Sequence, residues 1–214
     1  IVLNHNSDDT SMVLGKKNHV LYGKGFIEDE IMYTRFRIST NTFYQVNPVQ
    51  TEKIYSTAIQ MAQLKSTDTV LDMCCGIGTI SLIAAKKASF VLGVEINEDS
   101  IRDAIGNAKR NSIKNAQFIA CDSEEFIEQL EDSPNVVFLD PPRNGFTENF
   151  MKQLDHLKSD KIVYISCNPS TQARDIAFLK HYQIKKIVPV DNFPFTKHVE
   201  TVVLLSQLKQ KPDD

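Results

Sequence analysis

The sequence predicts a doubly wound α/β fold, in which helices cover both faces of a mostly parallel sheet. From Thr69 onward, short apolar runs alternate regularly with segments of helical period. The runs are rich in Val, Ile and Leu along their whole length, which is typical of parallel strands buried on both faces. A Gly-x-Gly turn follows the first of these runs and leads into a helical segment. Together these observations favour an open sheet with its ligand site at the carboxyl ends of the strands.

The alternation assigns the elements in order. We expect a helix capped by Asn47, with Pro48 at its first position and Gln50 completing a capping box. Strands are then expected over 69–73, 90–95, 117–121, 136–140, 161–166, 184–190 and 200–206. Helices are expected over 79–87, 98–112 and 171–181, and near 124–130 and 148–157.

The first 46 residues lack helical period and contain short β-rich runs at 1–3, 20–22 and 32–38. In the last run Met32, Thr34, Phe36 and Ile38 alternate with Tyr33, Arg35 and Arg37. This is the period of a half-buried strand whose exposed face carries both arginines. The sequence therefore divides into a β-rich subdomain (1–46), an α/β domain (47–208) and a polar tail (209–214).

Composition limits the class of protein. The 214 residues are 42% hydrophobic and 24% charged, as in a soluble globular chain of one domain with a small appendage. No run is long enough to span a membrane. The net charge of −3 gives no general attraction for nucleic acid, which would need a local basic patch or a missing domain. The chain begins at Ile1 on an apolar run, so we expect a fragment of a longer protein.

Four cysteines occur, at positions 74, 75, 121 and 167. Their spacing matches neither a zinc site nor an iron-sulfur site. A disulfide framework is also unusual in so large a chain, so we expect reduced thiols, a cytoplasmic protein and no metal site in these residues.

A first group of residues suggests a cofactor site. Gly76 and Gly78 let the backbone after the first strand approach a ligand, although a lone Gly-x-Gly also occurs in turns that bind nothing. Glu95 ends the second strand, where a carboxylate can accept hydrogen bonds from the hydroxyls of a ribose. Asp122 follows the third strand and could receive an adenine amino group. The three-glycine dinucleotide fingerprint is missing, so this set fits S-adenosylmethionine better than a nicotinamide dinucleotide.

A second group of residues follows later strands. Asp140 precedes two prolines and Arg143, in a rigid turn at the end of the fourth strand; the acid could merely cap the turn, and the arginine could be a surface charge. Cys167 follows the fifth strand, although an isolated cysteine is more often a small buried apolar residue. Glu200 enters the last strand, and His198 nearby could equally be a capping or core histidine.

The sequence resembles the RNA 5-methyluridine methyltransferases, which act on uracil C5 in bacterial 23S ribosomal RNA and in transfer RNA, and it is closest in pattern to the 23S enzymes. The resemblance runs from about Tyr22 to Leu205. It rests on five motifs in order: Phe43-Tyr44-Gln45-Val46-Asn47-Pro48, Asp72-Met73-Cys74-Cys75-Gly76-Ile77-Gly78-Thr79, Asp140-Pro141-Pro142-Arg143, Ser166-Cys167-Asn168-Pro169 and His198-Val199-Glu200.

The resemblance implies a fold, a cofactor and residue roles. The fold is the Rossmann-like sheet of class I S-adenosylmethionine-dependent methyltransferases, with an antiparallel C-terminal strand. The cofactor site would comprise Gln45, Cys74, Gly76, Gly78, Thr79, Glu95, Asp122 and Asp140. Cys167 would be the nucleophile and Glu200 the base, whereas Cys74 stands where an aromatic residue is often found. Members often carry an amino-terminal RNA-binding barrel and an iron-sulfur cluster, neither of which can be placed in these residues.

The implied chemistry needs an accessible uracil, because a thiolate must attack C6 before C5 can accept a methyl group. A low thiol pKa would help that attack. Asp140, Arg143 and Phe43 would contact the base, and Tyr44 and Phe195 are further candidates for stacking. A monomer acting on RNA is expected, with 23S RNA favoured and transfer RNA open. Two alternatives remain: an amino-group methyltransferase, which would leave Cys167 unexplained, and a catalytically silent RNA-binding module.

Overall fold

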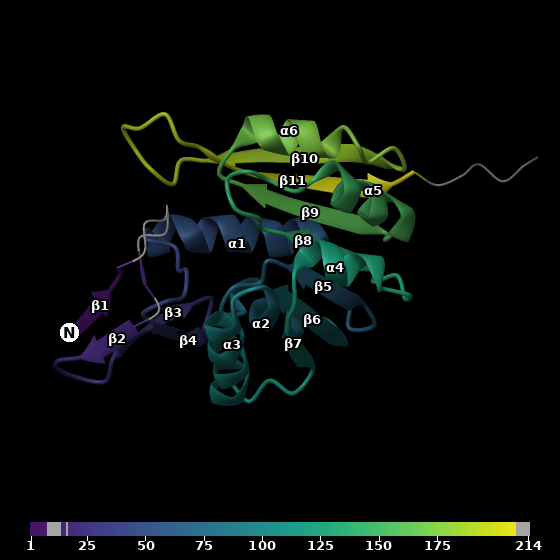
Figure 1. Cartoon of the computed structure of the whole chain (residues 1–214). Coiled ribbons are helices and arrows are strands. Elements are labelled where there is room, and N and C mark those ends of the chain that lie inside the picture. Colours follow the sequence, from purple (N-terminus) through teal and green to yellow (C-terminus); the bar gives the residue numbers. More distant parts are fainter. Residues whose placement is uncertain (8–13, 16, 209–214) are drawn as a thin grey trace, which may run out of the picture.

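A seven-stranded sheet forms the centre of the molecule (Figure 1). The computed structural model describes residues 1–7, 14–15 and 17–208, so the tail prediction (209–214) lies outside the described residues. Along the sheet the strand order is β10-β11-β9-β8-β5-β6-β7. The strands are β5 (Thr69–Met73), β6 (Phe90–Glu95), β7 (Ala116–Ala120), β8 (Val136–Leu139), β9 (Lys161–Ser166), β10 (Tyr182–Val190) and β11 (Glu200–Gln207).

The direction of the strands matches the predicted fold class. Strands β5 to β9 pair in parallel, whereas β11 runs antiparallel to both β9 and β10. The mostly parallel sheet with an antiparallel C-terminal strand is therefore confirmed.

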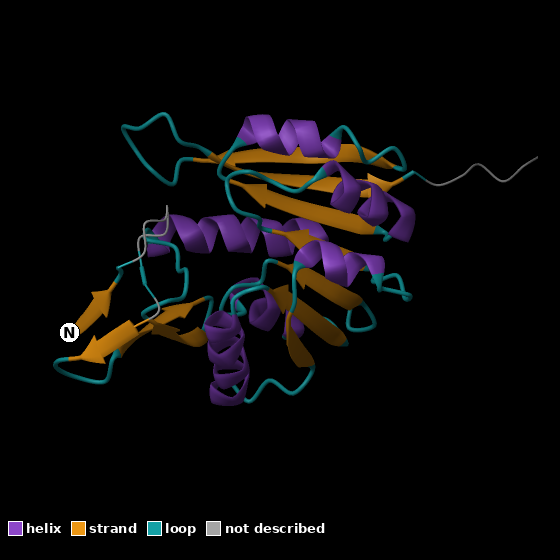
Figure 2. Cartoon of the chain, in the orientation of Figure 1, coloured by secondary structure: helices purple, strands orange, loops and turns teal. Residues whose placement is uncertain are grey.

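Helices cover both faces of this sheet (Figure 2). They are α1 (Pro48–Ala62), α2 (Thr79–Ala85), α3 (Glu98–Arg110), α4 (Ser123–Glu128), α5 (Glu148–Leu157) and α6 (Pro169–Ile176). Along β5, Val70 packs into one apolar cluster with α1 and α2, and Leu71 packs into a second cluster with α4 and α5. Because successive strand residues face opposite sides, a strand covered by helices on both faces carries apolar residues at neighbouring positions, as Val70 and Leu71 do.

Helix α1 begins as predicted. Asn47 caps it, since its Oδ1 accepts a hydrogen bond from the Gln50 backbone N–H at 3.3 Å, and Pro48 occupies the first turn. The Asn47 Nδ2 also donates to the backbone carbonyl of Asn192 at 3.0 Å. This bond ties the start of α1 to the segment that precedes β11.

The predicted strand over 32–38 is wrong at its start. Met32 and Tyr33 have positive φ angles, 49° and 58°, and form the turn of a hairpin between β3 (Phe26–Ile31) and β4 (Thr34–Ser39). The alternation of apolar and polar residues continues through this two-residue turn, so the pattern does not reveal the turn. Strand β3 contains three consecutive acidic residues, a composition more typical of a loop. Arg35 and Arg37 are exposed, as predicted.

Other boundaries shift by a few residues. A second hairpin pairs β1 (Val2–His5) with β2 (Lys17–Val20), which ends before Leu21 and Tyr22. Helix α2 ends at Ala85 and not at Lys87. Helix α6 begins earlier than predicted, because Asn168 caps it and Pro169 starts its first turn, and it ends at Ile176 instead of His181. The domain boundary at 46/47 stays a prediction.

The free edge of β4 is paired with side chains of α3. Asn107, fully buried, accepts from the Arg37 backbone N–H at 2.7 Å and donates to the Arg37 carbonyl at 3.1 Å. One helical turn later, Asn111 bonds the backbone of Arg35 in the same two ways, at 2.9 and 2.7 Å. These amides replace the strand that would otherwise complete the sheet edge.

Asp103 extends the pattern by one turn in the other direction. Its carboxylate accepts from the Ser39 backbone N–H at 2.8 Å and from the Ser39 hydroxyl at 2.9 Å. The spacing fits because four helical residues rise by about 6 Å and two strand residues by about 7 Å. The ladder of Asp103, Asn107 and Asn111 thereby docks the β3–β4 hairpin onto the α/β sheet.

Among the described residues, no helix is both long and apolar enough to cross a membrane.

We expect Asn107→Ala to lower the free energy of unfolding by about 2 kcal/mol, because it leaves backbone groups of the buried β4 edge without partners. Chemical denaturation followed by circular dichroism would measure the loss. The matched control is Ile105→Ala, an exposed position on the same helix. Equal stability of the two variants would contradict the structural role of the ladder.

Candidate active site

A cavity of about 920 Å³ opens at the carboxyl edge of the parallel strands. Its walls come from the residues that follow β5, β6, β7, β8 and β9, from the start of β11, and from two flanking segments, 41–45 and 193–198. This is the edge where open α/β sheets bind their ligands. The cavity collects most of the predicted site residues: Phe43, Gln45, Cys74, Gly76, Thr79, Glu95, Asp122, Asp140, Arg143, Cys167 and Glu200.

One wall is the turn between β5 and α2. Cys74, Gly76 and Gly78 all have positive φ, at 62°, 54° and 81°. The Gly76 N–H donates to Glu95 Oε2 at 3.2 Å, and Oε1 of the same carboxylate accepts from the Asn97 N–H at 2.9 Å. Glu95 therefore shapes the turn while remaining half-buried at the cavity wall.

Gly78 differs from the prediction, because it does not line the cavity. It lies buried behind the turn, where a Cβ atom would come within 3.0 Å of the Phe118 ring. At Gly76, in contrast, no described residue other than its two chain neighbours has an atom within 4 Å of the position of a Cβ. Gly78 thus permits the turn to pack on the sheet, and Gly76 leaves open space on the cavity side.

The third strand contributes Asp122 and Ser123. Asp122 Oδ1 caps α4 by accepting from the Glu124 N–H at 2.8 Å, so part of this carboxylate has a structural role. The Cys74 Sγ lies 3.6 Å from the Ser123 hydroxyl. Burial raises the pKa of the Cys74 thiol to about 12, so it forms a small neutral part of the wall and is no nucleophile at neutral pH.

The opposite side of the cavity brings together Asp140, Cys167 and Glu200. Asp140 follows β8 and Cys167 follows β9, its parallel neighbour. Thr201 pairs with Ser166 in the antiparallel β11–β9 ladder, so Glu200 and Cys167 are the next residues on the two adjacent strands. Sequence positions 33 apart are thereby placed side by side.

Burial and neighbouring charges favour the neutral forms of these groups. Burial raises the pKa of Asp140, and the charges of Glu200 and Asp72 raise it further. Burial likewise raises the pKa of Glu200, which the Asn192 side chain lowers in part. The pKa of the Cys167 thiol is raised by burial and then by Glu200, whereas Arg143 lowers it. The lowered thiol pKa that would help nucleophilic attack is therefore not present in this state.

Arg143 is exposed and lines the cavity. Its Nη2 is 3.3 Å from His198 Nδ1, and its backbone carbonyl accepts a hydrogen bond from Thr171 Oγ1 at 3.2 Å. His198 meets the Phe193 ring edge-on, at 6.3 Å between ring centroids. The turn after β8 is therefore linked to α6 and to the segment that leads into β11.

Only some of the aromatic residues predicted to stack on the target base line the cavity. Phe43 lines the cavity with 73% of its surface exposed, and Tyr44 lines it while donating from its hydroxyl to Asp29 Oδ2 at 3.1 Å. Phe195 points into solvent and does not line the cavity; Phe193 does. Sequence reasoning could not choose between these two phenylalanines, because both lie in the same short turn-rich segment.

Two buried polar residues near the cavity were not predicted as site residues. Tyr55 of α1 lines the cavity and interacts with Gln45. Asp72 on β5 accepts from the Ser81 hydroxyl at 2.5 Å, and burial raises its pKa to about 7. Its charged residue type inside an apolar strand was the signal that could have identified it.

Comparisons with known proteins agree with this geometry. A family model described as tRNA (Uracil-5-)-methyltransferase matches residues 11–208. The chain belongs to this family. Its sequence is 46% identical over 213 residues to a protein of Caldanaerobacter subterraneus subsp. tengcongensis described as an uncharacterized RNA methyltransferase, covering 97% of this chain and 47% of that protein. A Listeria innocua protein of the same description is 44% identical over 96% of this chain and 47% of its own.

Among solved structures, the chain is similar to Pyrococcus abyssi tRNA (uracil-54, C5)-methyltransferase in complex with S-adenosyl-L-homocysteine. The TM-score is 0.79 and the identity 33%, over 94% of this chain and 49% of that one. The chain thus spans about half the length of the family members that it matches. Both the predicted family and the predicted methyltransferase fold are confirmed.

The described residues contain no group of three or more His, Cys, Asp or Glu side chains that could hold a metal ion. All four cysteines are free thiols.

We expect alkylation of Cys167 by iodoacetamide to accelerate with pH up to an unusually alkaline midpoint, because burial and Glu200 disfavour the thiolate. Glu200→Gln should move the midpoint to lower pH, and Arg143→Gln should move it to higher pH. Mass spectrometry of the Cys167 peptide measures the rate, with the Cys121 peptide of the same digest as an internal control. A midpoint that neither substitution moves would contradict this electrostatic account.

Proposed function

We propose that this protein transfers a methyl group from S-adenosylmethionine to C5 of a uridine in RNA. Cys167 is the nucleophile and Glu200 the base. The observation that carries the proposal is that a thiol, directly after β9, and a carboxyl group, at the start of the neighbouring β11, line the same cavity as the Gly76 turn.

The residues around the turn suit S-adenosylmethionine, which supplies an electrophilic methyl group on a sulfonium ion. The space above Gly76 is open, and Ile77 and Ile96 give apolar surfaces beside it. Glu95 and Asp122 follow adjacent strands and offer carboxylate oxygens for the ribose and the adenine amino group. Gln45 and Asp140 line the part of the cavity between this turn and Cys167, where the reacting groups must meet.

Attack by Cys167 makes C5 of uracil nucleophilic enough to accept a methyl group. Its thiolate attacks C6 and forms a C–S bond, while the C5–C6 π electrons move toward C4 as an enolate. Arg143 is the cation that stabilises the thiolate in this cavity, since it alone of the named neighbours lowers the pKa of Cys167. The electron-rich C5 would then form a bond to the methyl carbon of the sulfonium, whose S–CH3 bond breaks and leaves its electron pair on sulfur as a neutral thioether.

Glu200 completes the reaction. Its carboxylate removes the C5 proton, the C5–C6 double bond re-forms and the C–S bond breaks, which restores the thiolate. The raised pKa of Glu200 makes its ionised form a stronger base than an exposed carboxylate. Asp140 lines the same cavity and would hydrogen-bond to the uracil.

A uracil stacked in a helix cannot present C5 and C6 to these groups, so the target is unpaired or extruded. Phe43 is exposed at the cavity rim and suits stacking on the extruded base or its neighbour. Motif similarity favours 23S RNA, whereas the family description and the P. abyssi enzyme refer to transfer RNA. Both RNAs are therefore used as substrates in the experiment that tests the proposal.

We expect RNA containing 5-fluorouridine to trap the protein as a covalent complex when S-adenosylmethionine is present, because fluorine cannot leave as a proton. A denaturing gel with labelled 23S fragments or transfer RNA would show the shifted band. Cys167→Ala should abolish the band, and Cys121→Ala is the matched cysteine control. A band that persists in Cys167→Ala would overturn the assignment of the nucleophile, and amino-group methylation without any band would favour the alternative chemistry.

Glu200→Gln should accumulate a methylated protein–RNA adduct on ordinary RNA, because methyl transfer proceeds but the C5 proton stays in place. Radioactive methyl groups that migrate with the protein on a denaturing gel would measure it. We expect turnover to fall by roughly 10²-fold or more, the usual contribution of a general base. Normal turnover with no adduct would show that another group is the base.

A further inference from the structure

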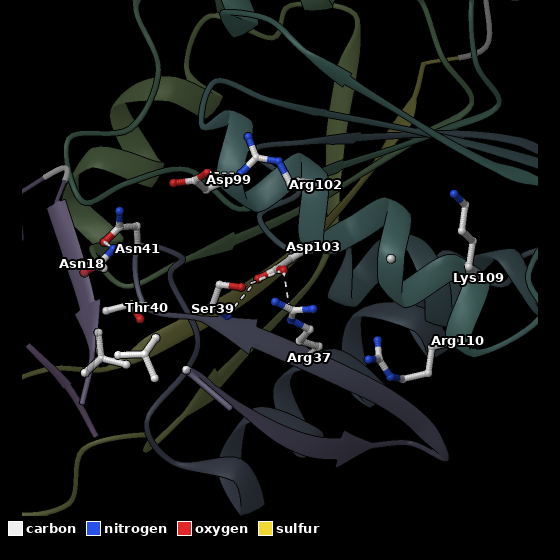
Figure 3. A pocket seen from close by; sticks show the side chains of 14 residues that line it. Asn18, Arg37, Ser39, Thr40, Asn41, Asp99, Arg102, Asp103, Lys109 and Arg110 are labelled. Carbon is white, nitrogen blue, oxygen red and sulfur yellow. Dashed lines mark hydrogen bonds and ion pairs between the residues drawn. The ribbon is translucent and has the colours of Figure 1, made fainter. Parts of the chain in front are cut away.

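A second cavity, of about 730 Å³, lies outside the catalytic one (Figure 3). It is formed by the exposed side of β4, the β1–β2 hairpin and one side of α3. Four of its lining residues are cations, namely Arg37, Arg102, Lys109 and Arg110. We call this cavity the α3 groove.

The two acids that line the groove are already paired with neighbouring groups. Asp103 is buried and accepts both hydrogen bonds from Ser39, with Arg37 Nε 3.9 Å away (Figure 3). Asp99 forms an ion pair with Arg102 at 2.5 Å. Because the Arg102 side chain is 72% exposed, this pair is weak in water, and a guanidinium has further donors to offer.

The remaining cations are not neutralised within the groove. Lys109 is exposed and forms no ion pair within 1–7, 14–15 and 17–208. Arg110 lies 3.8 Å from Glu28, a distance at which a half-exposed pair contributes little. Arg102 and Lys109 are two helical turns apart, a rise of about 10 Å, so they can contact different phosphates of one strand. The groove is therefore a local basic surface on a chain whose net charge is −3.

The α3 groove adjoins the catalytic cavity. Asn41 lines both cavities, and its backbone carbonyl accepts from Asn97 Nδ2 at 3.1 Å. At the first turn of α3, Asn97 and Ser100 face the catalytic cavity, whereas Arg102 faces the groove. A nucleotide strand that leaves the catalytic cavity past Asn41 would enter the groove directly.

We propose that the α3 groove binds the phosphate backbone of the RNA segment that flanks the target uridine. This inference rests on the proposed function, because RNA is the substrate proposed for the catalytic cavity. Phosphate contacts position an RNA without reading its sequence, and they supply the attraction that the acidic chain lacks as a whole. A row of exposed cations suits a flexible polyanion, and its affinity should depend strongly on salt.

The test uses the double variant Arg102→Gln/Lys109→Gln of the whole chain. Binding of a fluorescent single-stranded RNA would be measured from about 50 to about 300 mM KCl. We expect affinity at low salt to fall by roughly tenfold, and the slope of log affinity against log salt to fall by about 1.4, or about 0.7 for each phosphate that the variant no longer neutralises. The matched control is Lys185→Gln/Lys186→Gln, which removes two exposed lysines of β10 at the far edge of the sheet.

A groove variant whose affinity and salt slope equal those of the control would overturn the inference. Trapping on 5-fluorouridine RNA keeps this result separate from the proposed function. If the wild type forms the adduct and the groove variant needs more RNA to reach the same final yield, both proposals stand. If the wild type forms no adduct but the groove variant still binds RNA more weakly and with a smaller salt slope than the control, only the proposed reaction fails.

Discussion

The reversal of one strand determines which side chains meet in the candidate active-site cavity. In a parallel sheet all strands end at the same edge, so Asp140 and Cys167 reach that edge as the residues after β8 and β9. Strand β11 runs the other way between β9 and β10, and its first residue, Glu200, therefore lies at the edge where β9 ends. A parallel strand in the same place would have carried Glu200 to the opposite edge of the sheet. The proposed nucleophile and base depend on this antiparallel pairing.

The same placement has an electrostatic cost that the chain only partly offsets. Burial raises the pKa values of Asp72, Asp140 and Glu200, and the charges of Glu200 and Asp72 raise that of Asp140 further. At Cys167, Arg143 is the cation that opposes the rise in pKa caused by burial and Glu200. Buried like charges favour the neutral forms of these groups. Groups with such perturbed pKa values are typical of sites built for proton transfer. The Arg143 turn, tied to His198 and α6, keeps the cation in place.

The hydrogen-bonded ladder between α3 and β4 determines both how the β3–β4 hairpin docks and where the basic groove forms. Asn107 and Asn111 hydrogen-bond to the backbone of the β4 edge that faces α3, and Asp103 bonds to Ser39 at the end of that edge. Because some side chains of α3 bind β4, other side chains of the same helix, including its cations, line the groove between α3, β4 and the β1–β2 hairpin. The groove proposed for RNA is thus a direct consequence of how the β3–β4 hairpin docks on α3. It places the basic surface beside the candidate active-site cavity, at Asn41.

The sequence by itself determined the fold class, the order of most strands and helices, and the Gly76 turn with Glu95 and Asp122. It also placed Asp140, Cys167 and Glu200 at strand ends. These features are local: hydrophobic period, capping residues and strand ends are written within a few positions of one another. The hairpin turn at Met32, the exclusion of Phe195 and the cavity positions of Tyr55 and Phe193 were decided only by tertiary structure. So was the pairing of Asn107 with Arg37, 70 residues away, because such contacts exist only once distant segments pack together.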